Sequence, residues 1–239
     1  MQPLALRSRS SLVQAVLSLS ALLLSVTFAS RTEAQVLGAP GTVAIGVENV
    51  TGYDAITRKY NNVNNVEITD TTTQFSLLFK TGARVGVHYF FIPRVSLGGS
   101  LGYESFAGST TQPDGGGNYS VDKGTNSKFL LHLKAGYLLP LSNSAGFWFR
   151  AGPGVIRSGT HPQAYDRYVV TETFWTVGLD VLFVYAPLPV VGFFAGPTGD
   201  ISFVGRHSEE NFGNNNDQSY SHSGSYRRLG LDLGMMAMF

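Results

Sequence analysis

In the carboxyl-terminal segment, residues 226–239, apolar side chains occupy every odd position from Leu229 onward. From Leu229 to Phe239 the odd positions carry Leu, Leu, Leu, Met, Ala and Phe. The even positions from Arg228 carry Arg, Gly, Asp, Gly, Met and Met. A period of two is the signature of a β-strand with two different faces, so we expect residues 226–239 to form such a strand.

Seven earlier segments repeat this alternation, and each keeps its apolar side chains on odd positions. They span residues 42–50, 73–91 with a break near Gly82, 95–106, 127–139, 146–157, 171–186 and 190–206. None shows the i, i+3, i+4 recurrence of an amphipathic helix. Since antiparallel neighbours of one parity share a continuous apolar surface, the pattern predicts an all-β, eight-stranded up-and-down antiparallel barrel.

Short and long connections alternate between these segments. Proline occurs in all three short connections, at 92–94, 140–145 and 187–189, where its fixed φ suits a tight turn. The other connections are rich in Asn, Gly and Ser, and we expect four long loops there, at about 51–72, 107–126, 158–170 and 207–225.

The first 34 residues are typical of a secretory signal peptide. Arg7 and Arg9 precede an apolar run over residues 12–28, and Thr32-Glu33-Ala34 supplies small residues before Gln35. An anchoring helix is the alternative, but this run is slightly short for a membrane span and contains serines. We therefore expect a cleaved signal at 1–34 and one domain over 35–239.

Composition excludes several kinds of protein. The chain has no cysteine, which removes disulfide frameworks, thiolate metal sites and cysteine nucleophiles. The formal charge of +1 gives no reason to expect nucleic-acid binding.

The direction of the apolar face decides between a soluble and a membrane barrel. In a soluble lipocalin-like barrel the apolar face lines the interior. The interior of an eight-stranded barrel is only about wide enough for side chains to fill it, which suits the glycines and compact polar residues of the even face. The bulky odd face carries aromatic residues near both ends, as in the two girdles of a membrane barrel. We therefore predict a transmembrane barrel, closed because an open sheet edge in hydrocarbon would leave backbone groups unpaired.

The even face then carries charges into the interior. They are Glu48, Arg84, Glu104, Lys134, Arg150, Asp180, Asp200, Arg228 and Asp232, together with His88 and His132. Paired charges of this kind could form an ion pathway or gate. The alternative, which we expect given the barrel width, is a structural plug in which opposite charges satisfy one another.

Signals for catalysis are few, and we expect no enzyme, cofactor or metal site. Residues 98–102 formally match G-x-S-x-G, but they lie within a strand and not at a strand-to-helix turn. An enzyme acting at the lipid face would need an outward His and Ser pair. His88 and His132 have inward parity, while His161, His207 and His222 fall in expected loops.

With eight strands, alternating turns and loops, and a terminal Phe239, the chain resembles the small outer-membrane β-barrel family that includes OmpX and the barrel domain of OmpA. Asp232, Gly234 and Phe239 match that family's carboxyl-terminal assembly signal, and Ala237 departs from it. The resemblance implies a Gram-negative outer membrane, a periplasmic amino terminus and extracellular loops. The implied partners are outer-membrane lipids and the barrel-assembly machinery.

Two classes of function remain open from the sequence. The first is a non-enzymatic envelope protein that contributes structure or binds an extracellular ligand through its loops. The second is a small channel or a lipid-A-modifying barrel enzyme.

Overall fold

The computed structural model describes residues 37–61, 67–76, 84–114, 117–161, 168–211 and 218–239, so the expected signal at 1–34 lies outside the described residues. The strands are β1 (Val43–Asn61), β2 (Glu67–Ser76), β3 (Arg84–Ile92), β4 (Val95–Asp114), β5 (Gly117–Pro140), β6 (Ala145–His161), β7 (Tyr168–Leu188), β8 (Val191–Asn211) and β9 (Gln218–Met238). Within these ranges, no helix is long and apolar enough to cross a membrane.

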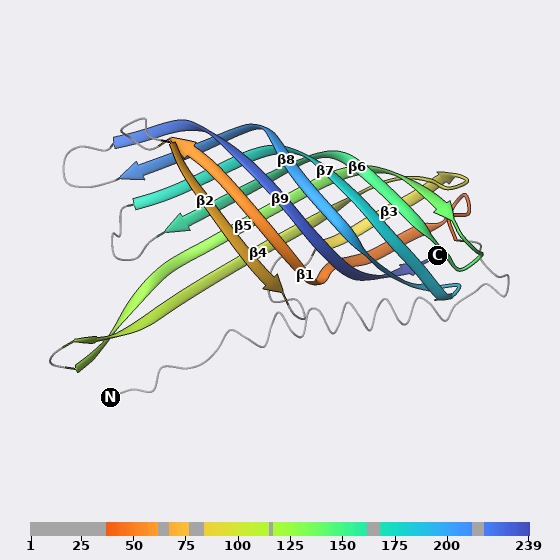
Figure 1. The fold of residues 1–239 in the computed structure, drawn as a ribbon, viewed down its shortest axis with the longest axis horizontal. Coiled ribbons are helices and arrows are strands. Elements are labelled where there is room, and N and C mark those ends of the chain that lie inside the picture. Colours follow the sequence, from red (N-terminus) through yellow and green to blue (C-terminus); the bar gives the residue numbers. More distant parts are fainter. Residues whose placement is uncertain (1–36, 62–66, 77–83, 115–116, 162–167, 212–217) are drawn as a thin grey trace.

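The strands form one antiparallel sheet that closes on itself through the pairing of β1 with β9 (Figure 1). Two strands share one position in the wall, because β3 pairs with residues 43–48 of β1 and β2 pairs with residues 52–61. The wall therefore has eight positions, and the predicted up-and-down barrel is confirmed. The expected strand at 73–91 is divided between β2 and β3.

The two ends of the barrel differ. At one end, the short-turn end, β3, β5 and β7 connect to the following strands through brief links, and the carboxyl terminus lies there too (Figure 1). One of these links contains Arg94 in the left-handed region, with a φ of 67°. At the opposite end, the extended end, the strands run on as long hairpins.

The four segments expected to be long loops are largely strand. β1 continues to Asn61, β4 and β5 pair as far as Asp114 and Gly117, β6 reaches His161, and β8 pairs with β9 out to Asn211. Hydrogen-bonded pairing continues here although the sequence of these segments lacks the regular apolar alternation of a strand with one apolar face. His161, His207 and His222 are consequently strand residues and not loop residues.

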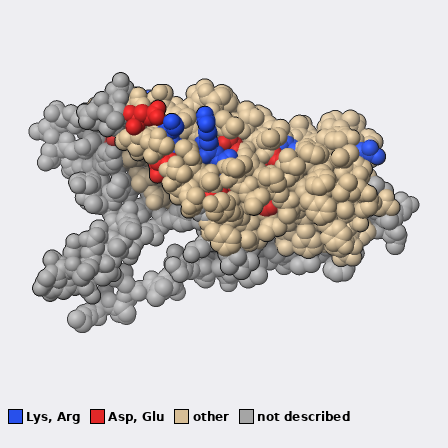
Figure 2. Space-filling view, in the orientation of Figure 1, with Lys and Arg blue, Asp and Glu red and all other residues tan. Residues whose placement is uncertain are grey.

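Side chains at odd positions point outward over most of the wall. Leu97, Leu133, Leu179 and Leu231 are all more than half exposed, and with their neighbours they form an outward apolar belt. On the face shown in Figure 2, charged side chains are sparse over the body of the barrel and denser toward the extended end.

Strand β1 breaks this parity at the buried Asn49, and strand β8 breaks it near its outer end. A register shift between β8 and β9 lies between Ile201 and Arg206. Phe203 still points outward, but Val204 and Arg206 are exposed and His207 is buried, so the prediction of outward odd positions is wrong for the part of β8 beyond Phe203.

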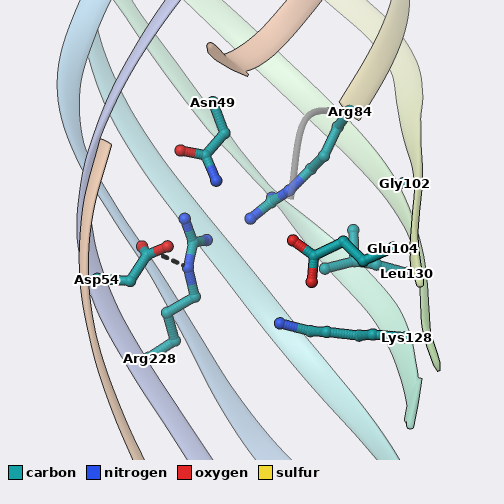
Figure 3. Close-up of a pocket in the computed structure, with 8 residues that line it drawn as sticks. All are labelled: Asn49, Asp54, Arg84, Gly102, Glu104, Lys128, Leu130 and Arg228. Atoms are coloured by element: carbon teal, nitrogen blue, oxygen red, sulfur yellow. Dashed lines mark hydrogen bonds and ion pairs between the residues drawn. The ribbon is translucent and has the colours of Figure 1, made fainter. Parts of the chain in front are cut away.

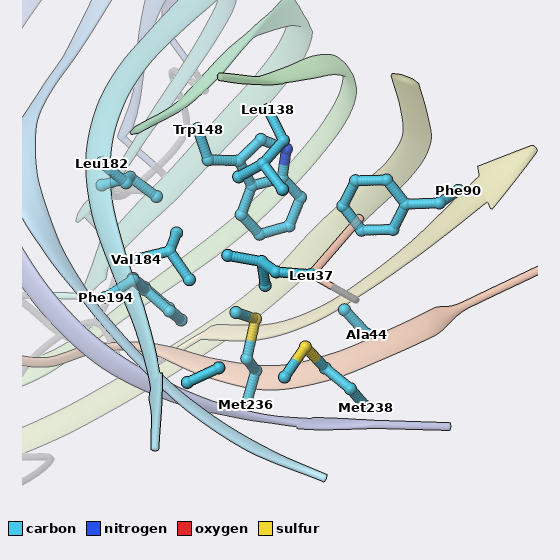
Figure 4. Packing of buried hydrophobic residues seen from close by; sticks show 11 residues of the cluster. Leu37, Ala44, Phe90, Leu138, Trp148, Leu182, Val184, Phe194, Met236 and Met238 are labelled. Carbon is cyan, nitrogen blue, oxygen red and sulfur yellow. The ribbon is translucent and has the colours of Figure 1, made fainter. Parts of the chain in front are cut away.

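Apolar layers close the interior at two levels. The first, the short-turn core, is contributed by eleven buried side chains: Leu37, Ala44, Phe90, Leu138, Trp148, Leu182, Val184, Ala186, Phe194, Met236 and Met238 (Figure 4). Leu37 precedes β1 and enters the barrel from the short-turn end, held by hydrogen bonds around Gly38 and Gly41, which both have positive φ. The second, the outer apolar layer, comprises Ile56, Leu130, Ile156, Phe174 and Tyr226.

Candidate functional site: the interior charge network

The interior between these two apolar layers is filled by charged side chains. The first group centres on Arg150 of β6, which is 3% exposed. Its guanidinium donates to Glu48 of β1 and, through Nε at 2.9 Å, to Oδ2 of Asp180 on β7. Lys134 of β5 donates to the same Asp180 oxygen at 2.6 Å. Four strands are thus tied together across the lumen by opposite charges.

The second group centres on Arg228 of β9, which is 4% exposed. Its Nε lies 2.7 Å from Oδ1 of Asp54, and its two terminal nitrogens each lie 3.0 Å from a carboxylate oxygen, one on Asp200 and one on Asp232. Asp200 also meets Nε2 of His132 at 3.1 Å. The planar guanidinium can serve three carboxylates at once because its donors point in different directions.

Arg84 and Glu104 do not join these ion pairs. They line a cavity of about 20 Å³, and Figure 3 shows Glu104 between Arg84 and Lys128. Among the described residues, Arg84 has no ion-pair partner within 4.0 Å, and Oε1 of Glu104 is buried without a hydrogen-bond partner. The cavity has polar walls and room for about one water molecule, which would satisfy these groups.

The two predicted histidines also lie inside. His88 is within 3.2 Å of the Arg150 guanidinium and packs edge-on against Trp148. His132 lies beside Asp200, with Thr176 at 3.4 Å.

Two charges of this central region, Asp54 and Lys128, are absent from the set that the sequence predicts. Asp54 falls within the first expected loop, and Lys128 of β5 lies at the outer end of an expected strand. Both sit at even positions of continuing strands, and that parity is the signal that identifies them. With them included, the described part of this central network and of the cavity beside it holds five cations and six carboxylates: Arg84, Lys128, Lys134, Arg150 and Arg228 against Glu48, Asp54, Glu104, Asp180, Asp200 and Asp232. This near balance limits the cost of burying charge.

The residues considered for other chemistry are placed as follows. Ser100 lies within β4, buried and facing inward, so residues 98–102 do not form a strand-to-helix turn. In the described part of the chain, no group of three or more His, Asp or Glu residues is arranged to hold a metal ion.

The residues of the expected assembly signal occupy β9 and the residue after it. Asp232 points inward to Arg228, and Gly234 lies against Phe194, whose ring would be 2.2 Å from an added Cβ. Phe239 exchanges two backbone hydrogen bonds with Val43, at 2.9 and 3.0 Å.

No protein-family model matches this chain, and no curated protein sequence matches it. Solved structures do. The outer membrane protein OprG from Pseudomonas aeruginosa aligns with a TM-score of 0.56 at 8% identity, over 84% of this chain and 97% of that one. Neisserial surface protein A aligns at 0.47 and 14% identity, over 82% and 99%. The attachment invasion locus protein Ail of Yersinia pestis aligns at 0.39 and 10% identity, over 84% and 99%. The fold of this chain is that of the small outer-membrane β-barrels.

Proposed function

We propose that this chain is an integral outer-membrane β-barrel protein that is closed to solutes, has no enzymatic activity, and acts through the hairpins at its extended end. The outward apolar belt supports membrane insertion, because such a surface suits lipid and not water. The shared fold with OprG supports the same location.

In the proposed orientation the short-turn end faces the periplasm and the extended end faces the outside of the cell. Outer-membrane lipids cover the belt. The barrel-assembly machinery binds the carboxyl-terminal strand through Asp232, Gly234 and Phe239.

The filled interior is the observation that carries the proposal of a closed barrel. Lys134 is 1% exposed and Leu182 is 0% exposed, so neither the charged middle nor the short-turn core leaves an open path. The cavity at Arg84 and Glu104 has room for only about one water molecule, and a hydrated ion needs a continuous column of water.

Planar-bilayer recording tests this proposal. Purified protein, inserted at the density at which a control porin gives clear steps, is expected to give no stable single-channel current. Steady steps of porin-like size from this protein would contradict a closed barrel.

Shortening one hairpin tests the role of the extended end. Replacing residues 107–125 by a two-residue turn removes the outer part of β4 and β5 and leaves the paired residues below Phe106 and Asn126 intact. We expect this variant to keep a heat-modifiable gel mobility and to lose binding to host cells or extracellular matrix. Unchanged binding after each hairpin is shortened in turn would contradict a binding role.

A further inference from the structure

A second group of charges lies at the extended end, above the outer apolar layer. His207 of β8 has a side chain that is 5% exposed, and its Nδ1 lies 3.2 Å from Oε1 of Glu172 on β7. Its Nε2 lies 3.0 Å from Oε1 of Glu209. A neutral imidazole has only one N–H, so only the imidazolium can donate to both carboxylates.

This group joins strands that are not neighbours in the wall. Tyr60 of β1 stacks on the His207 ring, with centroids 4.2 Å apart and planes 13° from parallel. Arg58 of β1 lies 3.5 Å from Oε2 of Glu172, to which Ser158 of β6 also donates. Since β9 separates β1 from β8, and β8 and β9 separate β1 from β7, these contacts cross the mouth of the barrel.

The contacts lie directly above the outer apolar layer. Ile56 and Arg58 are successive inward residues of β1, and Phe174 and Glu172 are successive inward residues of β7. Loss of the charged contacts would therefore expose Ile56 and Phe174 to water first.

We propose that His207, Glu172, Glu209, Arg58 and Tyr60 form a pH-sensitive latch that holds the extended end of the barrel closed in mildly acidic solution and releases it on either side.

The charges of these side chains explain why the latch opens both in stronger acid and in base. Among the described residues, six titratable or charged groups face His207 or its partners: Arg58 and Tyr60 of β1, Asp70 of β2 as the register partner of Arg58, Glu172 of β7, Glu209 of β8, and His222 of β9 as the register partner of His207. In acid, protonated glutamates would leave Arg58, His207 and His222 as mutually repelling cations. In base, a neutral His207 keeps one N–H for two carboxylates.

The directions of the pKa shifts agree with this window, and both groups lie beyond the apolar belt. Burial opposes the charge of His207, but hydrogen bonds to Glu172 and Glu209 outweigh it and raise the pKa of His207 above 6.5. Burial likewise opposes the charge of Glu172, but the bond from His207 and the charge of Arg58 lower the pKa of Glu172 below 4.5.

Stability of the latch follows from these signs. Because the pKa of His207 is raised, protonated His207 stabilises the closed mouth fully below pH 6.5. This stabilisation is lost as the pH rises through the raised pKa of His207. Because the pKa of Glu172 is lowered, ionised Glu172 stabilises the closed mouth fully above pH 4.5. This stabilisation is lost as the pH falls through the lowered pKa of Glu172. The latch is therefore tightest between pH 4.5 and 6.5.

Fluorescence quenching measures the opening. The reporter protein carries Phe174→Trp, with Trp148 and Trp175 both replaced by Phe, so that one tryptophan lies just beneath the latch. Acrylamide is an uncharged quencher whose access to that ring reports opening without itself titrating. We expect quenching to be weakest between pH 4.5 and 6.5 and to rise on both sides.

Two variants of the reporter protein separate the latch from general loosening. Glu172→Gln removes the central charge and is expected to raise the open fraction by about tenfold or more near pH 5.5, as for loss of a hydrogen bond to a charged group. Glu67→Gln is the matched control, because Glu67 pairs with Lys59 in an exposed ion pair outside the latch, and it should leave quenching unchanged. If Glu172→Gln does not assemble, Glu209→Gln removes the other carboxylate and takes its place. Quenching that is independent of pH, or unaffected by either latch substitution in an assembled barrel, would overturn the proposal.

Discussion

Replacing Arg228 by Met is expected to destabilise the barrel severely. Arg228 is 4% exposed and is the ion-pair partner of Asp54, Asp200 and Asp232. Methionine preserves much of the length of the side chain but leaves these buried carboxylates facing one another. Removing one partner from a buried ion pair costs about 3–5 kcal/mol, because the remaining charge is uncompensated. We expect a loss of at least that size in the free energy of unfolding, since one guanidinium serves three acids.

The neighbouring residue provides the control. Arg227 is exposed on the outer side of the same strand, so Arg227→Met should change stability by no more than about 0.5 kcal/mol. Both variants can be refolded into lipid vesicles and titrated with urea, with tryptophan fluorescence as the signal. A loss below about 1 kcal/mol for Arg228→Met, the usual size for an ordinary substitution, would refute the argument that this cation holds the outer part of the network together.

Two further perturbations have definite expected outcomes. Gly152→Ala would place a Cβ 2.0 Å from the backbone oxygen of Leu133, and we expect an overpacking loss of about 1–3 kcal/mol in the same urea titration. Gly159→Ala, whose nearest neighbour would be a side-chain oxygen at 3.3 Å, should be nearly neutral, and equal losses at both sites would contradict the packing explanation. Phe239→Ser leaves the backbone pairing with Val43 unchanged, so we expect normal refolding in detergent but a reduced outer-membrane yield in cells. A normal yield would remove the terminal aromatic ring from the assembly signal.

The sequence predicts those parts of the strands whose two faces meet different environments, an apolar one outside the barrel and a charged one inside it. Leu229, Leu231 and Leu233 alternate with Arg228, Gly230 and Asp232 because one face of β9 is apolar and the other is charged. The same contrast is enough to predict the inward direction of Lys134, Arg150 and Asp180, which are all buried in the barrel.

The hairpins at the extended end lack that contrast, so their sequence is typical of loops. Glu172 and His207 are directly paired across β7 and β8, but no alternation in either segment indicates that they are partners. The inward direction of His207 is also obscured by the register shift, which reverses parity beyond Phe203. A bulge of this kind depends on how two strands pair, and neither strand's own sequence specifies it.

The apolar layers inside the barrel also differ from the prediction. Phe90, Trp148 and Phe194 lie at even positions, where the pattern indicates compact polar residues. They fit because the short-turn end is closed by apolar packing, with Leu37 entering from outside the strands, and the charged side chains lie beyond this layer. A single sequence does not show how far along the barrel each layer sits.

The two tryptophans of the chain test most directly which face of the wall meets lipid. Trp175 points outward and is 52% exposed, whereas Trp148 points inward and is 2% exposed. In vesicles of brominated phospholipid, a Trp148→Phe protein, which retains only Trp175, is expected to lose most of its fluorescence. A Trp175→Phe protein, which retains only Trp148, is expected to keep most of it. Equal quenching of the two, or stronger quenching of Trp148, would contradict a barrel with its apolar belt in the membrane and its charges inside.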